Sequence, residues 1–176
     1  MKNYKEWLTE KTNAIKNSIE STMNNVFGES CISGSRPSSY SYQIAIQEGT
    51  IRLRTEILIL LNEAFDIIPN NIKNIEFVNL EITNIVDVVV KSIGTIIDEW
   101  ITLHKSDFAR NIKISNSMIA EINLDIYRET EKRKRMLEEN SKKNKKDILW
   151  KIVTVSNFII TIAISIIALV IASKTP

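Results

Sequence analysis

The sequence predicts an all-α protein: an antiparallel helical bundle with a long C-terminal helix that leads into a single transmembrane helix. Turn-forming residues are scarce, since the 176 residues include 4 Gly and 3 Pro, and this favours long helices over a turn-rich sheet protein. Apolar residues recur at steps of three, four or seven over four long stretches, which is helical spacing. The run 152–172 holds 21 residues without a charge, enough for a membrane span.

Two amphipathic helices are predicted over residues 2–27 and 42–68. The apolar face of the first consists of Leu8, Ile15, Ile19, Met23 and Val26. A linker rich in Ser, Gly and Pro follows at 28–41. The face expected for the second consists of Ile44, Ile51, Leu58, Leu61, Phe65 and Ile68, widened by Ile57, Leu60 and Ala64. Pro69 ends this helix, because proline disfavours a helical conformation in the residue before it.

The third predicted helix runs from Ile72 to about His104 and is the most apolar part of the body. Its many β-branched residues also suit a strand, but its apolar residues follow helical steps and do not alternate. They are Ile75, Ile82, Ile85, Val89, Ile93, Ile96 and Trp100. Because its polar stripe is narrow, we expect a central helix packed on most sides, or covered in part by a second copy of the chain.

A fourth helix is expected after Ser106 and Asp107, which suit an N-cap. Its core face would consist of Phe108, Ile112, Met118, Ile119, Ile122 and Ile126. After Tyr127 the sequence becomes highly charged. We therefore divide the chain into a cytosolic helical bundle (1–127), a basic juxtamembrane stalk (128–150), a transmembrane helix (151–173) and a short tail (174–176).

The uncharged run would measure about 31 Å as a helix, which matches a hydrocarbon core of about 30 Å. Its N-terminal flank is strongly basic, whereas Lys174 alone follows it. The positive-inside rule then predicts a single-pass, tail-anchored protein with a cytoplasmic N-terminus. Trp150 lies where an interfacial aromatic anchor is expected.

Charge is divided unevenly along the chain. Residues 1–127 hold 12 Lys or Arg and 16 Asp or Glu, whereas residues 128–151 hold 10 and 5. We expect the basic segment to contact an anionic cytoplasmic leaflet, through Lys132, Arg133, Lys134, Arg135, Lys142, Lys143, Lys145 and Lys146. No nucleic-acid partner is expected, because the adjacent apolar helix already brings these residues to an anionic surface.

No catalytic residue, cofactor site or metal site is predicted. The chain has one Cys, Cys31, and one His, His104, too few for the common zinc sites. Asp98 and Glu99 are adjacent and therefore point about 100° apart on a helix, a poor arrangement for paired acid–base work. The glycine-rich phosphate-binding motifs are absent. We expect a protein that is not an enzyme.

A polar stripe follows one side of the predicted membrane helix. On a helical wheel it covers an arc of roughly 80° and consists of Thr154, Asn157, Thr161, Ser165, Ala168 and Ala172. Small and hydroxyl residues allow close helix contact in lipid, and Asn can hydrogen-bond across an interface. The stripe predicts self-association or, with several copies around an axis, the lining of a weakly selective pore. Ser156 and Ala163 lie off it.

Three functions fit these features. The first is a homo-oligomeric effector that alters membrane permeability. The second is a membrane-tethered adaptor whose helical bundle binds another protein. The third is a regulator of cell death that receives an amphipathic partner helix in an apolar groove of the bundle.

Overall fold

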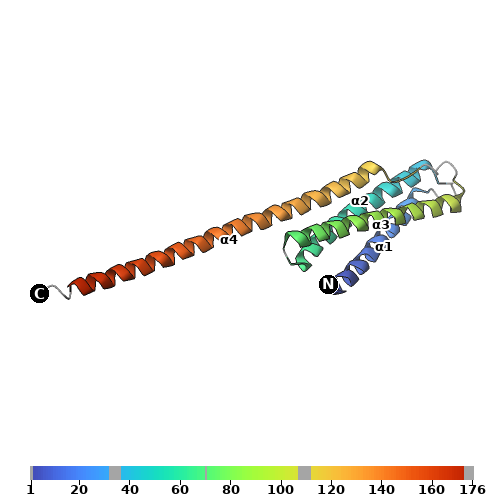
Figure 1. The fold of residues 1–176 in the computed structure, drawn as a ribbon. Coiled ribbons are helices and arrows are strands. Elements are labelled where there is room, and N and C mark those ends of the chain that lie inside the picture. The colour runs from blue at the N-terminus through green and yellow to red at the C-terminus, as the bar shows by residue number, and fades with distance from the viewer. Residues whose placement is uncertain (1, 32–36, 70, 107–111, 173–176) are drawn as a thin grey trace. The chain divides into compact units, whose positions relative to one another are not determined.

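The computed structural model describes residues 2–31, 37–69, 71–106 and 112–172, with side chains for those between 3 and 160. This part of the chain folds into four helices and contains no strand, which confirms the all-helical prediction (Figure 1). The helices are α1 (Lys2–Ser30), α2 (Ser39–Ile67), α3 (Ile72–His104) and α4 (Asn116–Ala172). The chain divides into two compact units, Met1–Arg133 and Lys134–Pro176, and the division falls within α4.

Local hydrogen bonds set the helix ends. The side chain of Ser38 caps α2, and that of Asn71 caps α3 by accepting from the Asn74 N–H at 2.9 Å, which satisfies a donor that the first turn leaves open. At the other end of α3, Lys105 adopts the left-handed conformation with a φ of 50°. Its N–H and that of Ser106 bond back to carbonyls of the last turn, a usual helix ending.

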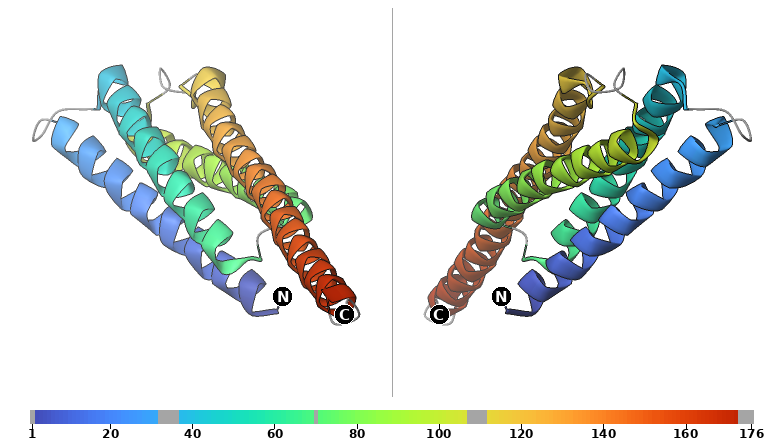
Figure 2. Two further views of the ribbon diagram at one scale, coloured as in Figure 1. Left: turned by 90° about the vertical axis from the view of Figure 1, so that its left-hand side faces the viewer. Right: turned by 90° about the vertical axis from the view of Figure 1, so that its right-hand side faces the viewer.

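The core of the first unit lies between α1, α2 and α3, which reverse direction in turn and lie side by side (Figures 1 and 2). In α1 the expected residues Leu8, Ile15, Ile19 and Met23 are buried, whereas Val26 is half-buried. Tyr4 and Phe27 extend this face at both ends. Most of the predicted face is confirmed, but α1 continues to Ser30, three residues beyond the predicted end. The linker predicted at 28–41 is shorter at both ends, because α2 begins at Ser39.

The buried face of α2 differs from the predicted one. Ile51, expected in the core, is 47% exposed, and Ile44 and Leu58 are half-buried. The buried residues include Tyr42, Ala45, Ile46, Gly49, Leu53, Ile57, Leu60, Leu61, Ala64 and Phe65. Three residues of this face, Ala45, Gly49 and Ala64, are small and allow α2 to lie close to its neighbours. Because the predicted face was built from large apolar side chains, small residues contributed little to it.

The bounds and the core face predicted for α3 are confirmed, since all seven expected residues are buried. The expectation that α3 is packed on most sides is wrong. Leu80 is 58% exposed and Val88 is 43% exposed, while the residues that α3 buries lie on one side of the helix. The other helices of the unit cover that side, so scattered apolar residues remain on the surface, as is common in proteins.

The start of α4 also differs from the prediction. Residues 112–115 are not helical, and α4 begins at Asn116. The Ser115 hydroxyl accepts from the Ser117 N–H, and the Ser115 carbonyl accepts from the Met118 N–H, so this serine supplies the cap expected of Ser106 and Asp107. Ile122 and Ile126 are buried as predicted, Ile112, Met118 and Ile119 are half-buried, and Phe108 lies outside the described residues.

Candidate functional site

The predicted lipid-contact residues of α4 fall into two groups. Lys142, Lys143, Lys145 and Lys146 are exposed, and Arg135 is too. In the first unit, Lys132 lies 3.3 Å from the Glu129 carboxylate, and the Arg133 guanidinium lies 3.8 Å from Asp66 and 5.8 Å from the centre of the Phe65 ring. Lys134 is half-buried. The lysines at 142–146 therefore present a run of exposed positive charge.

Directly after these lysines, α4 exposes large apolar side chains on every side. They are Ile148, Leu149, Trp150, Ile152, Val153, Val155, Phe158, Ile159 and Ile160, each between 48% and 72% exposed. At 100° per residue they are spread around the whole helix. A helix that is apolar all round is normally buried in protein or in lipid. We call residues 148–160 the apolar segment.

Two residues of the predicted polar stripe lie in the apolar segment. The Thr154 hydroxyl donates to the Trp150 carbonyl at 2.8 Å, a bond within the helix that leaves the hydroxyl oxygen able to accept from a neighbour. Asn157 is exposed to solvent. The side chains of Thr161, Ser165, Ala168 and Ala172 lie outside the described residues.

Within the described residues, no helix combines the length and the apolar character needed to cross a membrane. The described side chains of α4 end at Ile160, so they cover only the first part of the predicted run 152–172.

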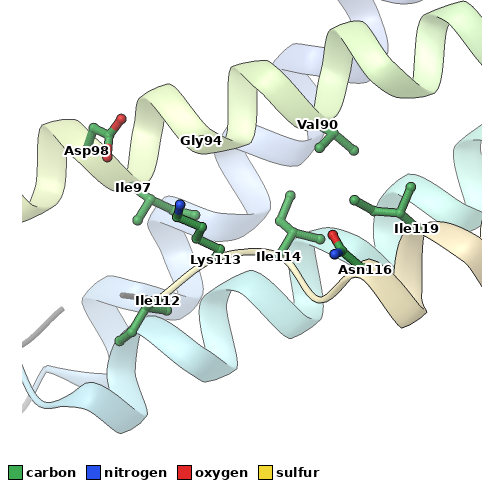
Figure 3. A pocket seen from close by; sticks show the side chains of 9 residues that line it. All are labelled: Val90, Gly94, Ile97, Asp98, Ile112, Lys113, Ile114, Asn116 and Ile119. Atoms are coloured by element: carbon green, nitrogen blue, oxygen red, sulfur yellow. The ribbon is translucent and has the colours of Figure 1, made fainter. Parts of the chain in front are cut away.

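A cavity of about 280 Å³ opens in the first unit between α3 and residues 112–119 (Figure 3). Its lining is mainly apolar, with Asp98, Lys113 and Asn116 as the polar members. On α3 the cavity borders Gly94, where an added Cβ would meet no atom within 4 Å. A second cavity of about 280 Å³, lined by Ile46 and Met118 among others, shares Ile112 and Lys113 with the first. Residues 112–115 are thus loosely packed.

No acid–base or metal centre stands out in the part of the chain that the structure describes. That part holds no group of three metal-ligating side chains. Asp98 and Glu99 are exposed, and the ring of His104, at the end of α3, packs 5.5 Å from that of Phe27. Burial, and secondarily the charge of Glu81, raises the pKa of Tyr4 from 10.0 to about 12, which keeps this hydroxyl protonated further into the alkaline range.

Comparison of the sequence with protein-family profiles and curated proteins, and of the fold with solved structures, gave no significant match.

The sequence did not indicate the polar contacts between α2 and α4. Arg54 of α2 donates from Nε to Asp125 of α4 at 2.7 Å and from Nη1 to Glu121 at 3.3 Å. The Arg54 and Asp125 positions are 71 residues apart. In sequence each is an ordinary charged residue of an amphipathic helix, so no local signal marks the pair.

Proposed function

We propose that this protein is a non-enzymatic, single-pass membrane protein that assembles as a homo-oligomer and alters the permeability of the bilayer. The main support is the apolar segment, in which side chains such as Trp150, Phe158 and Ile160 are exposed all round the helix. The uncharged sequence continues beyond it to Ala172. Covering this surface with lipid tails removes it from water, which is the dominant favourable term in burial.

The lysines at 142–146 support an anionic leaflet as the partner on the N-terminal side. They lie two to six residues before the apolar segment in the same helix, at the distance where basic residues meet lipid head groups. Trp150 lies near the N-terminal end of the apolar segment, where an amphipathic ring suits the interface. This arrangement favours a cytoplasmic first unit.

Support for self-association comes from Thr154 and Asn157 and from the stripe that the sequence continues at Thr161, Ser165, Ala168 and Ala172. In lipid, apolar side chains gain nothing by leaving the tails for another helix, so contact depends on close packing and polar bonds. An amide that faced hydrocarbon would cost free energy, whereas one that faced the same amide of another copy would be satisfied.

The deciding experiment is light scattering of the full chain in detergent, with the wild type beside the double variant Asn157→Leu with Thr161→Leu. We expect a defined wild-type oligomer that dissociates in the double variant, and vesicle leakage that falls with it. The matched control is Ser156→Leu with Ala163→Leu, which makes the same kind of change off the stripe and should leave the oligomer intact. A monomeric wild type that leaves vesicles tight would overturn the proposal.

A tethered adaptor is the second candidate. It is favoured by the cavity beside Gly94, which offers the bundle a place to receive a partner. A regulator of cell death that binds a partner helix is one form of such an adaptor. Replacing residues 151–173 with an unrelated membrane helix separates the candidates. An adaptor keeps its function after the exchange, whereas the permeability effector loses it.

A further inference from the structure

The first part of α4, residues 116–133, is held to the rest of its unit by few apolar contacts. Among the described residues, it contributes Ile122 and Ile126 to the buried apolar core. By comparison, α1 contributes Tyr4, Leu8, Ile15, Ile19, Met23 and Phe27. Since burial stabilises in proportion to apolar area, α4 gains less from the hydrophobic effect than α1 does.

Packing defects weaken the same contact between residues 116–133 and the rest of the first unit. The side-chain oxygen of Asn123 is buried without a hydrogen-bond partner among the described residues, which costs the free energy of its lost hydration. One cavity of about 280 Å³ borders the first turns of α4 at Asn116 and Ile119 (Figure 3). The other, also of about 280 Å³, borders them at Met118. The start of the helix therefore lacks contact atoms on two sides.

Specific polar contacts compensate for this sparse packing. The Asp125 carboxylate accepts a hydrogen bond from Arg54 Nε at 2.7 Å and forms an ion pair with Arg54 Nη2 at 2.5 Å, and its side chain is only 16% exposed. Thr130, which is buried, bonds to Asn79 of α3 at 3.2 Å. One turn later Arg133 reaches Asp66 and the Phe65 ring. We call this surface of α2 and α3 the α4 seat.

We propose that the α4 seat is an interaction surface for a second copy of this chain, which inserts its own residues 116–133 in exchange. Charge complementarity identifies this occupant, because Arg54 on the seat meets Asp125 and Glu121 on the helix that fills it. Exchange keeps every one of these contacts, so its main cost is the entropy of association. Two copies held in one membrane or oligomer have a high effective concentration, which lowers that cost.

This inference rests on the self-association in the proposed function but places it in the bundle, apart from the membrane stripe. The two can therefore be tested separately. The experiment uses the full chain with Asn157→Leu and Thr161→Leu throughout, so that contact through the stripe does not contribute.

In that background, a tagged Arg54→Asp chain is co-expressed with an untagged Asp125→Arg chain, and untagged chain is counted after capture of the tag in detergent. In the Arg54→Asp chain the introduced aspartate faces Asp125 and Glu121, and in the Asp125→Arg chain the introduced arginine faces Arg54. In an exchanged pair, the introduced aspartate meets the introduced arginine in one seat, and the original Arg54 meets the original Asp125 in the other. We expect capture up to about fivefold above that of either variant co-expressed with itself, the largest ratio that one surface ion pair usually gives.

Two controls keep the outcome decisive. Arg52 has nearly the same exposure as Arg54, at 48%, but pairs with Glu56 of its own helix, so Arg52→Asp co-expressed with Asp125→Arg should give no such excess. Arg54→Asp and Asp125→Arg combined in one chain should restore the thermal stability that each single change lowers. If the double variant regains thermal stability but no excess capture is seen, α4 stays in its own chain. If the double variant does not regain thermal stability, the pair of Arg54 and Asp125 does not hold α4 in place. Either result overturns the inference and leaves the membrane stripe untouched.

Discussion

Gly49 of α2 lies directly against Met23 of α1. A Cβ added at Gly49 would lie 2.5 Å from Met23 Cγ and 2.8 Å from its sulfur. Met23 is fully buried, so its side chain would have to shift within the core to make room for an added Cβ. The absence of a side chain at Gly49 therefore sets how closely α1 and α2 approach.

Gly49→Ala should lower the free energy of unfolding by about 1 to 3 kcal/mol, the usual cost of overpacking a core. Gly94→Ala is the matched control, since it lies inside α3 with no atom within 4 Å of the added Cβ. It should stabilise by roughly 0.5 to 1 kcal/mol through helix propensity. Urea denaturation followed by circular dichroism measures both, and equal effects at the two glycines would contradict this account.

Trp100→Ala should cost about 3 to 5 kcal/mol, as truncation of a large buried aromatic does. Trp100 stacks on Phe27 with ring centres 4.2 Å apart and donates from Nε1 to Asn24 at 3.2 Å. Trp150→Ala is the control, because this ring is 72% exposed and should change unfolding by less than about 0.5 kcal/mol. Thermal unfolding of each variant provides the measurement. Similar losses at both positions would show that Trp150 is also part of a packed core.

Stability should fall at alkaline pH because of Tyr4. The pKa of Tyr4 is about 12 in the folded chain against an ordinary value of 10.0, so the unfolded chain releases this proton first. The folded state binds more protons between these values, and stability that is present below about pH 10 is lost as the pH rises toward 12. Tyr4→Phe should reduce this loss, as measured by urea denaturation across that range.

The same substitution tests the burial of the Tyr4 hydroxyl, which has no hydrogen-bond partner among the described residues. Removing an unsatisfied buried polar group is neutral or favourable, so Tyr4→Phe should not destabilise the protein at neutral pH. Tyr127→Phe, at a residue 57% exposed, should leave the alkaline loss unchanged. A marked destabilisation by Tyr4→Phe at neutral pH would mean that the hydroxyl makes a bond in solution.

Changing Lys142, Lys143, Lys145 and Lys146 to Gln should lower the preference for anionic over neutral vesicles about fivefold per charge removed, since each is worth about 1 kcal/mol at such a surface. Vesicle flotation at two salt concentrations provides the measurement, and added salt should reduce the preference of the wild type. Lys132→Gln with Arg133→Gln should have a smaller effect per charge, because both cations already lie beside carboxylates. Equal effects per charge would mean that residues 132–133 also contact the vesicle surface.

Much of the fold follows from local sequence. The bounds of α3 were predictable because Asn71 supplies a cap and the apolar residues between Ile75 and Trp100 keep one helical period. The start of α4 was not predictable, because Ser106, Asp107 and Ser115 are all suitable N-caps and the sequence does not show which of them begins the helix. The uncharged run to Ala172 and the lysines before it are likewise evident from the sequence.

The sequence by itself determined the helical class, the order of the helices and the polar stripe that begins at Thr154, since these depend on residue type and spacing along one chain. Only the tertiary structure decided which face of α2 is buried, because small residues such as Gly49 become core residues only against a particular neighbour such as Met23. It also decided that Arg54 meets Asp125 across 71 residues. Contacts of that kind depend on how helices pack, which local periodicity does not encode.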